Sequence, residues 1–173
     1  MPRATTDLAK QFKNSLTTQT IMTTETKEPS RSTPLCKKDF SFFDPVTLRW
    51  ADNDSYGHVN NAHYYSFFDT AVDAFLLHYA LRPHISGRYQ TLVVASECRY
   101  FSQVSAPGTI QVGVRPHRLG RSSITYEVAV FTADLDQAAA QGLFVHVCVD
   151  KQSQRPEALP AGFREAIDKL RSA

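Results

Sequence analysis

The longest periodic segment of the chain, from about 60 to 81, predicts a single long helix. Apolar residues recur there every three or four positions and polar residues collect on the other side, which is the pattern of an amphipathic helix. Asn60 or Asn61 suits the N-cap position, and Pro83 ends the pattern. The apolar positions are Tyr64, Phe67, Phe68, Ala71, Val72, Phe75, Leu76 and Tyr79. This face is too wide for burial on one side only, so we expect a larger element to wrap the helix.

Most of the remaining chain predicts β-strands. Val46, Leu48 and Trp50 alternate with polar residues, the period of two that is typical of a half-buried strand. Four longer segments are rich in β-branched and aromatic residues, at 92–104, 109–118, 122–132 and 142–151. Short turns between them favour antiparallel pairing, and a last apolar pattern at 163–170 indicates a short helix. The order predicts an α+β fold, in which one curved antiparallel sheet wraps around a long central helix.

The 173 residues divide into a polar tail and a domain of ordinary composition. Residues 1–38 hold seven basic and three acidic residues, a net charge of +4, and we expect them to be disordered. Residues 39–173 hold 12 basic and 14 acidic residues, a net charge of −2, and are expected to fold as one domain. A slightly acidic domain gives no support for a nucleic-acid partner. No apolar run approaches the roughly 18 residues that a membrane span needs.

The tail also bears on localisation. Leu8, Phe12 and Leu16 lie four residues apart beside Lys10 and Lys13, and would form a short basic amphipathic helix of the kind found in mitochondrial presequences. The three cysteines include no CxxC pair, which favours a reducing compartment. We expect a cytoplasmic protein, with the mitochondrial matrix as the alternative.

The segment from Arg49 to Asn61 is the part of the chain that packing explains least. Between the first strand and the long helix it places two acidic residues, a glycine, a histidine and two asparagines. Free backbone N–H groups and the helix dipole favour negative charge at the start of a helix. A carboxylate and donors for a developing oxyanion would therefore lie close together, as acyl chemistry requires.

The motif Asp52-x-Asp54 is followed by Gly57-His58-Val59-Asn60-Asn61, and then by Tyr64 and Phe67-Phe68-Asp69 in the helix. This block resembles the hotdog-fold acyl-CoA thioesterases of the 4-hydroxybenzoyl-CoA thioesterase type. The resemblance extends over roughly residues 42–165 and includes weaker similarities at 101–108, 120–123 and 155–160. The tail has no counterpart.

The resemblance implies a role for several residues. Asp54 matches the catalytic carboxylate, which either attacks the thioester carbonyl or activates a water. The backbone N–H of Asn61 matches the donor that polarises the carbonyl, and Gly57 would let the chain turn sharply beside the substrate. His58 would bind the substrate or orient Asp54, with a structural histidine as the alternative.

Further positions are implied in substrate binding. Asn60 and Tyr64 would lie beside the substrate at the start of the helix. Arg121, Ser122 and Ser123 would contact the phosphates or pantetheine of coenzyme A, with an ordinary tight turn as the alternative. No metal or organic cofactor is implied, since coenzyme A belongs to the substrate.

Structural roles compete with chemistry at some of these positions. Asp54 could be a turn acid without chemistry, since Asp is common before helices. Asp52 is expected to hydrogen-bond within the turn, and Asp69 to make a packing or interface contact. His58 and His63 are five residues apart, which fails the i, i+4 spacing of a helical metal pair, so a metal site is disfavoured.

The predicted function is hydrolysis of an acyl-CoA thioester to a carboxylic acid and coenzyme A. The resemblance also implies a homodimer or homotetramer, whose acyl pocket lies between the helix of one subunit and the strands of another. The alternatives are a hotdog protein that binds acyl-CoA without hydrolysing it and an inactive accessory subunit. The acyl group cannot be predicted, because pocket depth depends on loops and on subunit packing.

Overall fold

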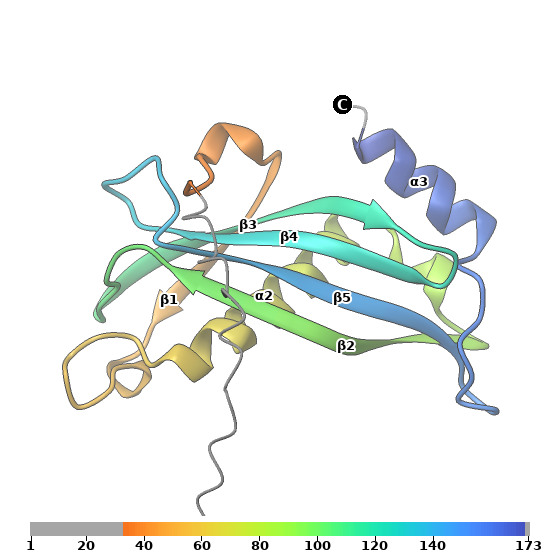
Figure 1. The fold of residues 1–173 in the computed structure, drawn as a ribbon, viewed down its shortest axis with the longest axis horizontal. Coiled ribbons are helices and arrows are strands. Elements are labelled where there is room, and N and C mark those ends of the chain that lie inside the picture. Colours follow the sequence, from red (N-terminus) through yellow and green to blue (C-terminus); the bar gives the residue numbers. More distant parts are fainter. Residues whose placement is uncertain (1–32, 172–173) are drawn as a thin grey trace, which may run out of the picture. The chain divides into compact units, whose positions relative to one another are not determined.

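The structure is a computed structural model and describes residues 33–171. The predicted targeting stripe at 8–16 lies outside the described residues. Five strands and two α-helices make up the described chain (Figure 1). The strands are β1 (Phe42–Leu48), β2 (Tyr89–Tyr100), β3 (Gly108–Leu119), β4 (Ser123–Phe131) and β5 (Ala140–Asp150), and the helices are α2 (Asn61–His78) and α3 (Ala161–Arg171). Short 3-10 turns η1 (Lys37–Asp39), η2 (Trp50–Asp52) and η3 (Arg82–Ile85) complete the order.

All five strands form one antiparallel sheet in the order β1-β3-β4-β5-β2. Alternate residues of the inner strands face α2 and pack against its apolar side, which gives one continuous core. The sheet contributes Ile110, Val112, Val114, Ile124, Tyr126, Val128, Val130, Phe144 and Cys148 to this core. Seven residues of α2 are buried against them, including Phe68 and Ala71, which are completely inaccessible. The predicted α+β hotdog fold, a curved antiparallel sheet around a long helix, is confirmed (Figure 1).

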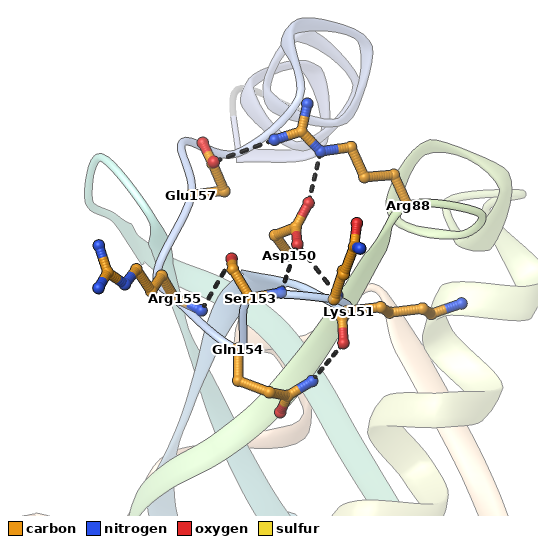
Figure 2. Close-up of polar contacts among 8 residues, drawn as sticks. Arg88, Asp150, Lys151, Ser153, Gln154, Arg155 and Glu157 are labelled. Atoms are coloured by element: carbon orange, nitrogen blue, oxygen red, sulfur yellow. Dashed lines mark hydrogen bonds and ion pairs between the residues drawn. The ribbon is translucent and has the colours of Figure 1, made fainter.

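A charged cluster around Asp150 holds together the end of the sheet at which β2 starts and β5 ends (Figure 2). The Asp150 carboxylate accepts hydrogen bonds from Arg88 Nε at 2.6 Å and from the backbone N–H groups of Gln152 and Ser153. These donors, first the Ser153 N–H and then Arg88, lower the pKa of Asp150 to about 2. Arg88 also donates to Glu157 at 3.1 Å. The cluster therefore ties the start of β2 to the end of β5 and to the loop before α3.

Two predictions about boundaries were wrong. Trp50 does not continue the first strand; its side chain is 86% exposed in η2. The reason is that Asp52 Oδ2 accepts the Arg49 N–H at 2.7 Å, and this hydrogen bond turns the chain out of the sheet. The folded chain also includes residues before 39, because Cys36 forms a β-bridge with Gln137 and the Ala138 N–H donates to the Leu35 carbonyl. None of the helices in residues 33–171 is long and apolar enough to cross a membrane.

Candidate active site

The loop between η2 and α2 is built around Asp52, which is only 1% exposed. Its carboxylate accepts from the Arg49 backbone and from the Arg49 guanidinium, at 2.7 Å in each case, and its carbonyl accepts from Asn60 N–H at 2.9 Å. The hydrogen bonds from Arg49 hold the pKa of Asp52 below its usual value, against the opposing effect of burial. Asp52 thus fixes both ends of the loop, which confirms the structural role predicted for it.

The loop folds back on itself, so that Asp54 lies near the start of α2. Asn53 and Val59 form an antiparallel bridge, and the Asn53 side chain hydrogen-bonds both backbone groups of Ala106 in the β2–β3 loop. Val59 N–H donates to the Val104 carbonyl at 2.8 Å. These contacts anchor the loop on two sides.

Asp54 is held by backbone groups rather than by another side chain. Its Oδ1 accepts the N–H of Tyr56 at 2.8 Å and that of His58 at 3.3 Å, which forms an Asx turn. Among residues 33–171, Oδ2 makes no hydrogen bond, so one carboxylate oxygen stays available to a substrate or a water. The side chain is half-buried.

Gly57 and His58 complete the turn around Asp54. Gly57 has a φ of +82°, a left-handed conformation that favours glycine, and its N–H donates to the Asp54 carbonyl. His58 contacts Asp54 through its backbone, because its N–H donates to the carboxylate and its carbonyl accepts the Asp54 N–H at 2.7 Å. The His58 imidazole makes no hydrogen bond to Asp54 in the described chain. The Asp54 carboxylate is therefore oriented by backbone N–H groups of the loop.

The start of α2 presents a free backbone donor. Asn60 is the N-cap, and its Oδ1 accepts the Ala62 N–H at 3.0 Å, as the sequence predicts. Asn61 is the first helical residue, and its N–H has no acceptor within the part of the chain that the structure describes. The Tyr100 hydroxyl lies 3.5 Å from the Asn61 carbonyl oxygen. Tyr64 packs edge-on against the Tyr100 ring and is 4% exposed, so it shapes the wall behind this end of the helix.

The structure does not bring Arg121, Ser122 and Ser123 to this site within one chain. They form the turn between β3 and β4, at the end of the sheet that Figure 1 shows on the right, while the 50–60 loop lies on the left. The intervening β3 is 12 residues long, so about 36 Å of strand separates the two ends. The turn packs against the C-terminal segment, since Leu159 N–H donates to the Arg121 carbonyl and Arg164 donates to the Gly120 carbonyl.

A cavity of about 630 Å³ opens between the second half of α2 and the first half of β2. Asp69, Thr70 and Asp73 line it from the helix, and Tyr89, Gln90 and Thr91 line it from the strand. His146 of β5 also lines it, is only 7% exposed, and has no hydrogen-bond partner among the described residues for either ring nitrogen. Burial lowers the pKa of His146 to about 4, although the Asp69 charge acts in the opposite direction.

The state of His146 makes folding stability depend on pH. In the unfolded chain the imidazole takes up a proton as the pH falls through 6.5, whereas the folded chain resists protonation down to about pH 4. The contribution of the neutral His146 to the free energy of unfolding is therefore fully present above pH 6.5 and is lost as the pH falls toward 4. We expect the free energy of unfolding, measured with urea, to fall by about 2 kcal/mol between pH 7 and pH 5 from this group alone. His146→Leu should lack this component; an equal pH dependence in both proteins would contradict the assignment.

Within residues 33–171, no three His, Cys, Asp or Glu side chains gather closely enough to hold a metal ion.

Comparison with known proteins places the chain in a family. The family model of the thioesterase-like superfamily matches residues 48–167, more than half of the sequence. The chain belongs to the thioesterase-like superfamily. Thioester hydrolysis is the activity for which this superfamily is named.

Solved structures and one sequence relative extend the comparison. The PA5185 protein of Pseudomonas aeruginosa strain PAO1 is 44% identical, with a TM-score of 0.72, over 80% of this chain and 96% of that one. A thioesterase of Thermus thermophilus, solved in complex with coenzyme A and Zn, is 31% identical, with a TM-score of 0.65, over 78% of this chain and 97% of that one. The uncharacterized protein YsmA of Bacillus subtilis (strain 168) is 27% identical over 89 residues, which span 51% of this chain and 60% of that protein.

Three residues of the loop, the helix start and the cavity were not predicted from the sequence. Asn53 anchors the loop, Tyr100 contacts the start of α2, and His146 lies in the cavity. The only sequence signal for His146 is its place inside the apolar run from Val145 to Val149.

Proposed function

We propose that this protein hydrolyses acyl-CoA thioesters to a carboxylic acid and coenzyme A. The observation that carries the proposal is the loop before α2, which holds the Asp54 carboxylate in an Asx turn and leads into the start of the helix, where the Asn61 N–H has no acceptor in residues 33–171. Membership of the thioesterase-like superfamily and likeness to a thioesterase solved with coenzyme A support the same chemistry.

In this proposal the Asn61 N–H and the Asp54 carboxylate have different roles in the reaction. Asn61 N–H donates to the thioester oxygen and stabilises the negative charge that develops there. Asp54 either attacks the carbonyl carbon or takes a proton from the water that attacks it. The C–S bond breaks, coenzyme A leaves as a thiolate that takes up a proton, and water supplies the new oxygen of the acid. His58 and Gly57 support Asp54 through their backbone.

Release of free thiol from a panel of acyl-CoAs tests the proposal. The panel should include short, medium and long aliphatic chains and aromatic acyl groups, with a thiol-reactive dye as the readout. We expect saturable hydrolysis of at least one class. Binding of acyl-CoA without release of thiol would instead indicate a non-catalytic binding protein, and the absence of both would indicate an accessory role.

The exposed edge of β2 supports a homodimer as the working form of this proposal. β2 is a terminal strand of the sheet, and its middle exposes Leu92, Val93 and Val94 by 42%, 47% and 59%. The stretch from Leu92 to Ser96 contains no charge and no proline, the usual devices that protect an edge strand from pairing. A second copy that pairs here would bury these side chains and continue the sheet.

A charge at this edge should therefore separate the subunits. Val94 lies where the register between β2 and β5 shifts, and no residue of β5 is paired with it. A lysine at this position therefore fits the single subunit without disturbing its sheet. We expect Val94→Lys to convert the dimer to a monomer in sedimentation or light scattering. Leu135→Lys, a similarly exposed position in the loop between β4 and β5, is the matched control and should keep the dimer. A wild-type monomer, or a dimeric Val94→Lys, would contradict this interface.

The dimer would also explain how the distant parts of the site meet. Antiparallel pairing about a two-fold axis near Val94 sets the Tyr100 end of one β2 beside the Tyr89 end of the other. The Tyr100 end carries Asn61, and the opposite end carries the cavity and, further along the sheet, the turn with Arg121, Ser122 and Ser123. Under this proposal each acyl group enters the cavity of one subunit while the other supplies Asp54.

A further inference from the structure

His146 is buried, without a hydrogen-bond partner in the described chain, in a place where the fold does not require a polar side chain. It lies on β5 opposite Val93 of β2 and Ile124 of β4, on the face of the sheet that packs against α2. The rings of Tyr126 and Phe144 pack beside it at 5.4 Å and 5.2 Å between centroids. Neither aromatic neighbour satisfies the ring nitrogens, and an apolar residue would fill this position without the penalty of an unpaired buried polar group.

The surroundings of His146 identify what it can bind. The imidazole is neutral at physiological pH, so it offers one N–H donor and one bare nitrogen acceptor. Two acidic and two basic side chains line the cavity: Asp73 is paired with Arg82, and Asp69 and Lys151 have no ion pair within residues 33–171. A hydroxyl both donates and accepts, so it can pair with either ring nitrogen, whereas an ionised carboxylate only accepts and cannot pair with the bare nitrogen.

We propose that His146 hydrogen-bonds a hydroxyl group on the acyl portion of the substrate and so selects hydroxyl-bearing acyl-CoAs over the corresponding plain ones. This inference rests on the proposed function, because it takes the cavity as the acyl site. Val72, Leu76 and Ile85 of the lining contact the hydrocarbon part, and His146 contacts the polar substituent. Recognition by a group left unpaired with the wrong ligand gives stronger discrimination than an apolar wall does.

Matched substrate pairs test the inference. The pairs are 3-hydroxybutyryl-CoA with butyryl-CoA, 3-hydroxydecanoyl-CoA with decanoyl-CoA, and 4-hydroxyphenylacetyl-CoA with phenylacetyl-CoA. We expect the wild-type protein to prefer the hydroxylated member of at least one pair at least tenfold in kcat/KM. In His146→Leu this ratio should fall to near one, through a higher KM for the hydroxylated member, while kcat/KM for the plain member is kept or raised.

Two further variants keep the outcome interpretable. His146→Gln retains a donor and an acceptor and should retain part of the preference, which covers the case in which His146→Leu folds poorly. His117→Leu removes an exposed histidine of β3 and should leave the ratio unchanged. Hydrolysis with the same ratio in wild type, His146→Leu and His146→Gln, or a wild type without preference in any pair, would overturn this inference alone. A wild type that hydrolyses no acyl-CoA would overturn the proposed function and this inference with it.

Discussion

Asp54→Asn should lower kcat for acyl-CoA hydrolysis at least about a hundredfold, which corresponds to about 2.7 kcal/mol of transition-state stabilisation. The substitution is well matched to the site because asparagine keeps an acceptor oxygen for the N–H groups of Tyr56 and His58. The Asx turn is therefore expected to survive. What is lost is the negative charge that serves as nucleophile or base, so the effect should fall on kcat rather than on folding.

Two controls separate chemistry from structure in this experiment. Asp134→Asn removes an exposed carboxylate in the loop between β4 and β5 and should keep the wild-type rate. Thermal unfolding of Asp54→Asn should match that of the wild type, whereas Asp54→Ala should also lose the turn and unfold at a lower temperature. Retention of full activity in a folded Asp54→Asn protein would exclude Asp54 from the chemistry.

Asn61→Pro should lower kcat by about a hundredfold to a thousandfold, the usual effect of removing one oxyanion donor. Proline has no backbone N–H, so this substitution deletes the proposed donor itself. The site tolerates it well because proline is favoured at the first position of a helix. Asn60 has φ −60° and ψ 136°, the extended conformation that a residue before proline adopts, and its cap accepts from Ala62 rather than from Asn61.

Asn61→Ala is the matched control for this prediction, since it changes the side chain and keeps the N–H. We expect it to retain most of the wild-type kcat. Circular dichroism should show the same helix content in both variants. If Asn61→Pro folds and keeps its activity, or if Asn61→Ala loses as much as Asn61→Pro does, the donor is not the Asn61 N–H.

The architecture could be predicted because local patterns decide it. The repeat of three and four in α2 and the alternation in the strands depend only on which residues are apolar, and the core uses those residues. The loop could be predicted because each residue acts through its own neighbours: Asn60 caps the next turn, and Gly57 adopts the positive φ that the bend requires. Trp50 failed as a strand residue because one side-chain hydrogen bond, from Arg49 N–H to Asp52, outweighed an alternation of only three positions.

Features that depend on distant contacts could not be predicted. His146 resembles any histidine in a buried strand until the neighbours of β5 show that none of the described residues satisfies its nitrogens. The β3–β4 turn matches a thioesterase motif locally, but only the strand order shows that it lies at the opposite end of the sheet from Asp54. Likewise, the uncharged stretch Leu92–Ser96 points to an interface only once the strand order shows that β2 is a terminal strand.

The most direct test of the central claim is to identify both products of one reaction run in water enriched in ¹⁸O. The wild-type protein is mixed with the preferred acyl-CoA, and mass spectrometry measures coenzyme A and the released acid over many turnovers. The account predicts equimolar free coenzyme A and carboxylic acid, with one solvent oxygen in the acid, and near-background amounts with Asp54→Asn. Intact acyl-CoA after prolonged incubation with folded wild-type protein, across the whole acyl-CoA panel, would contradict it.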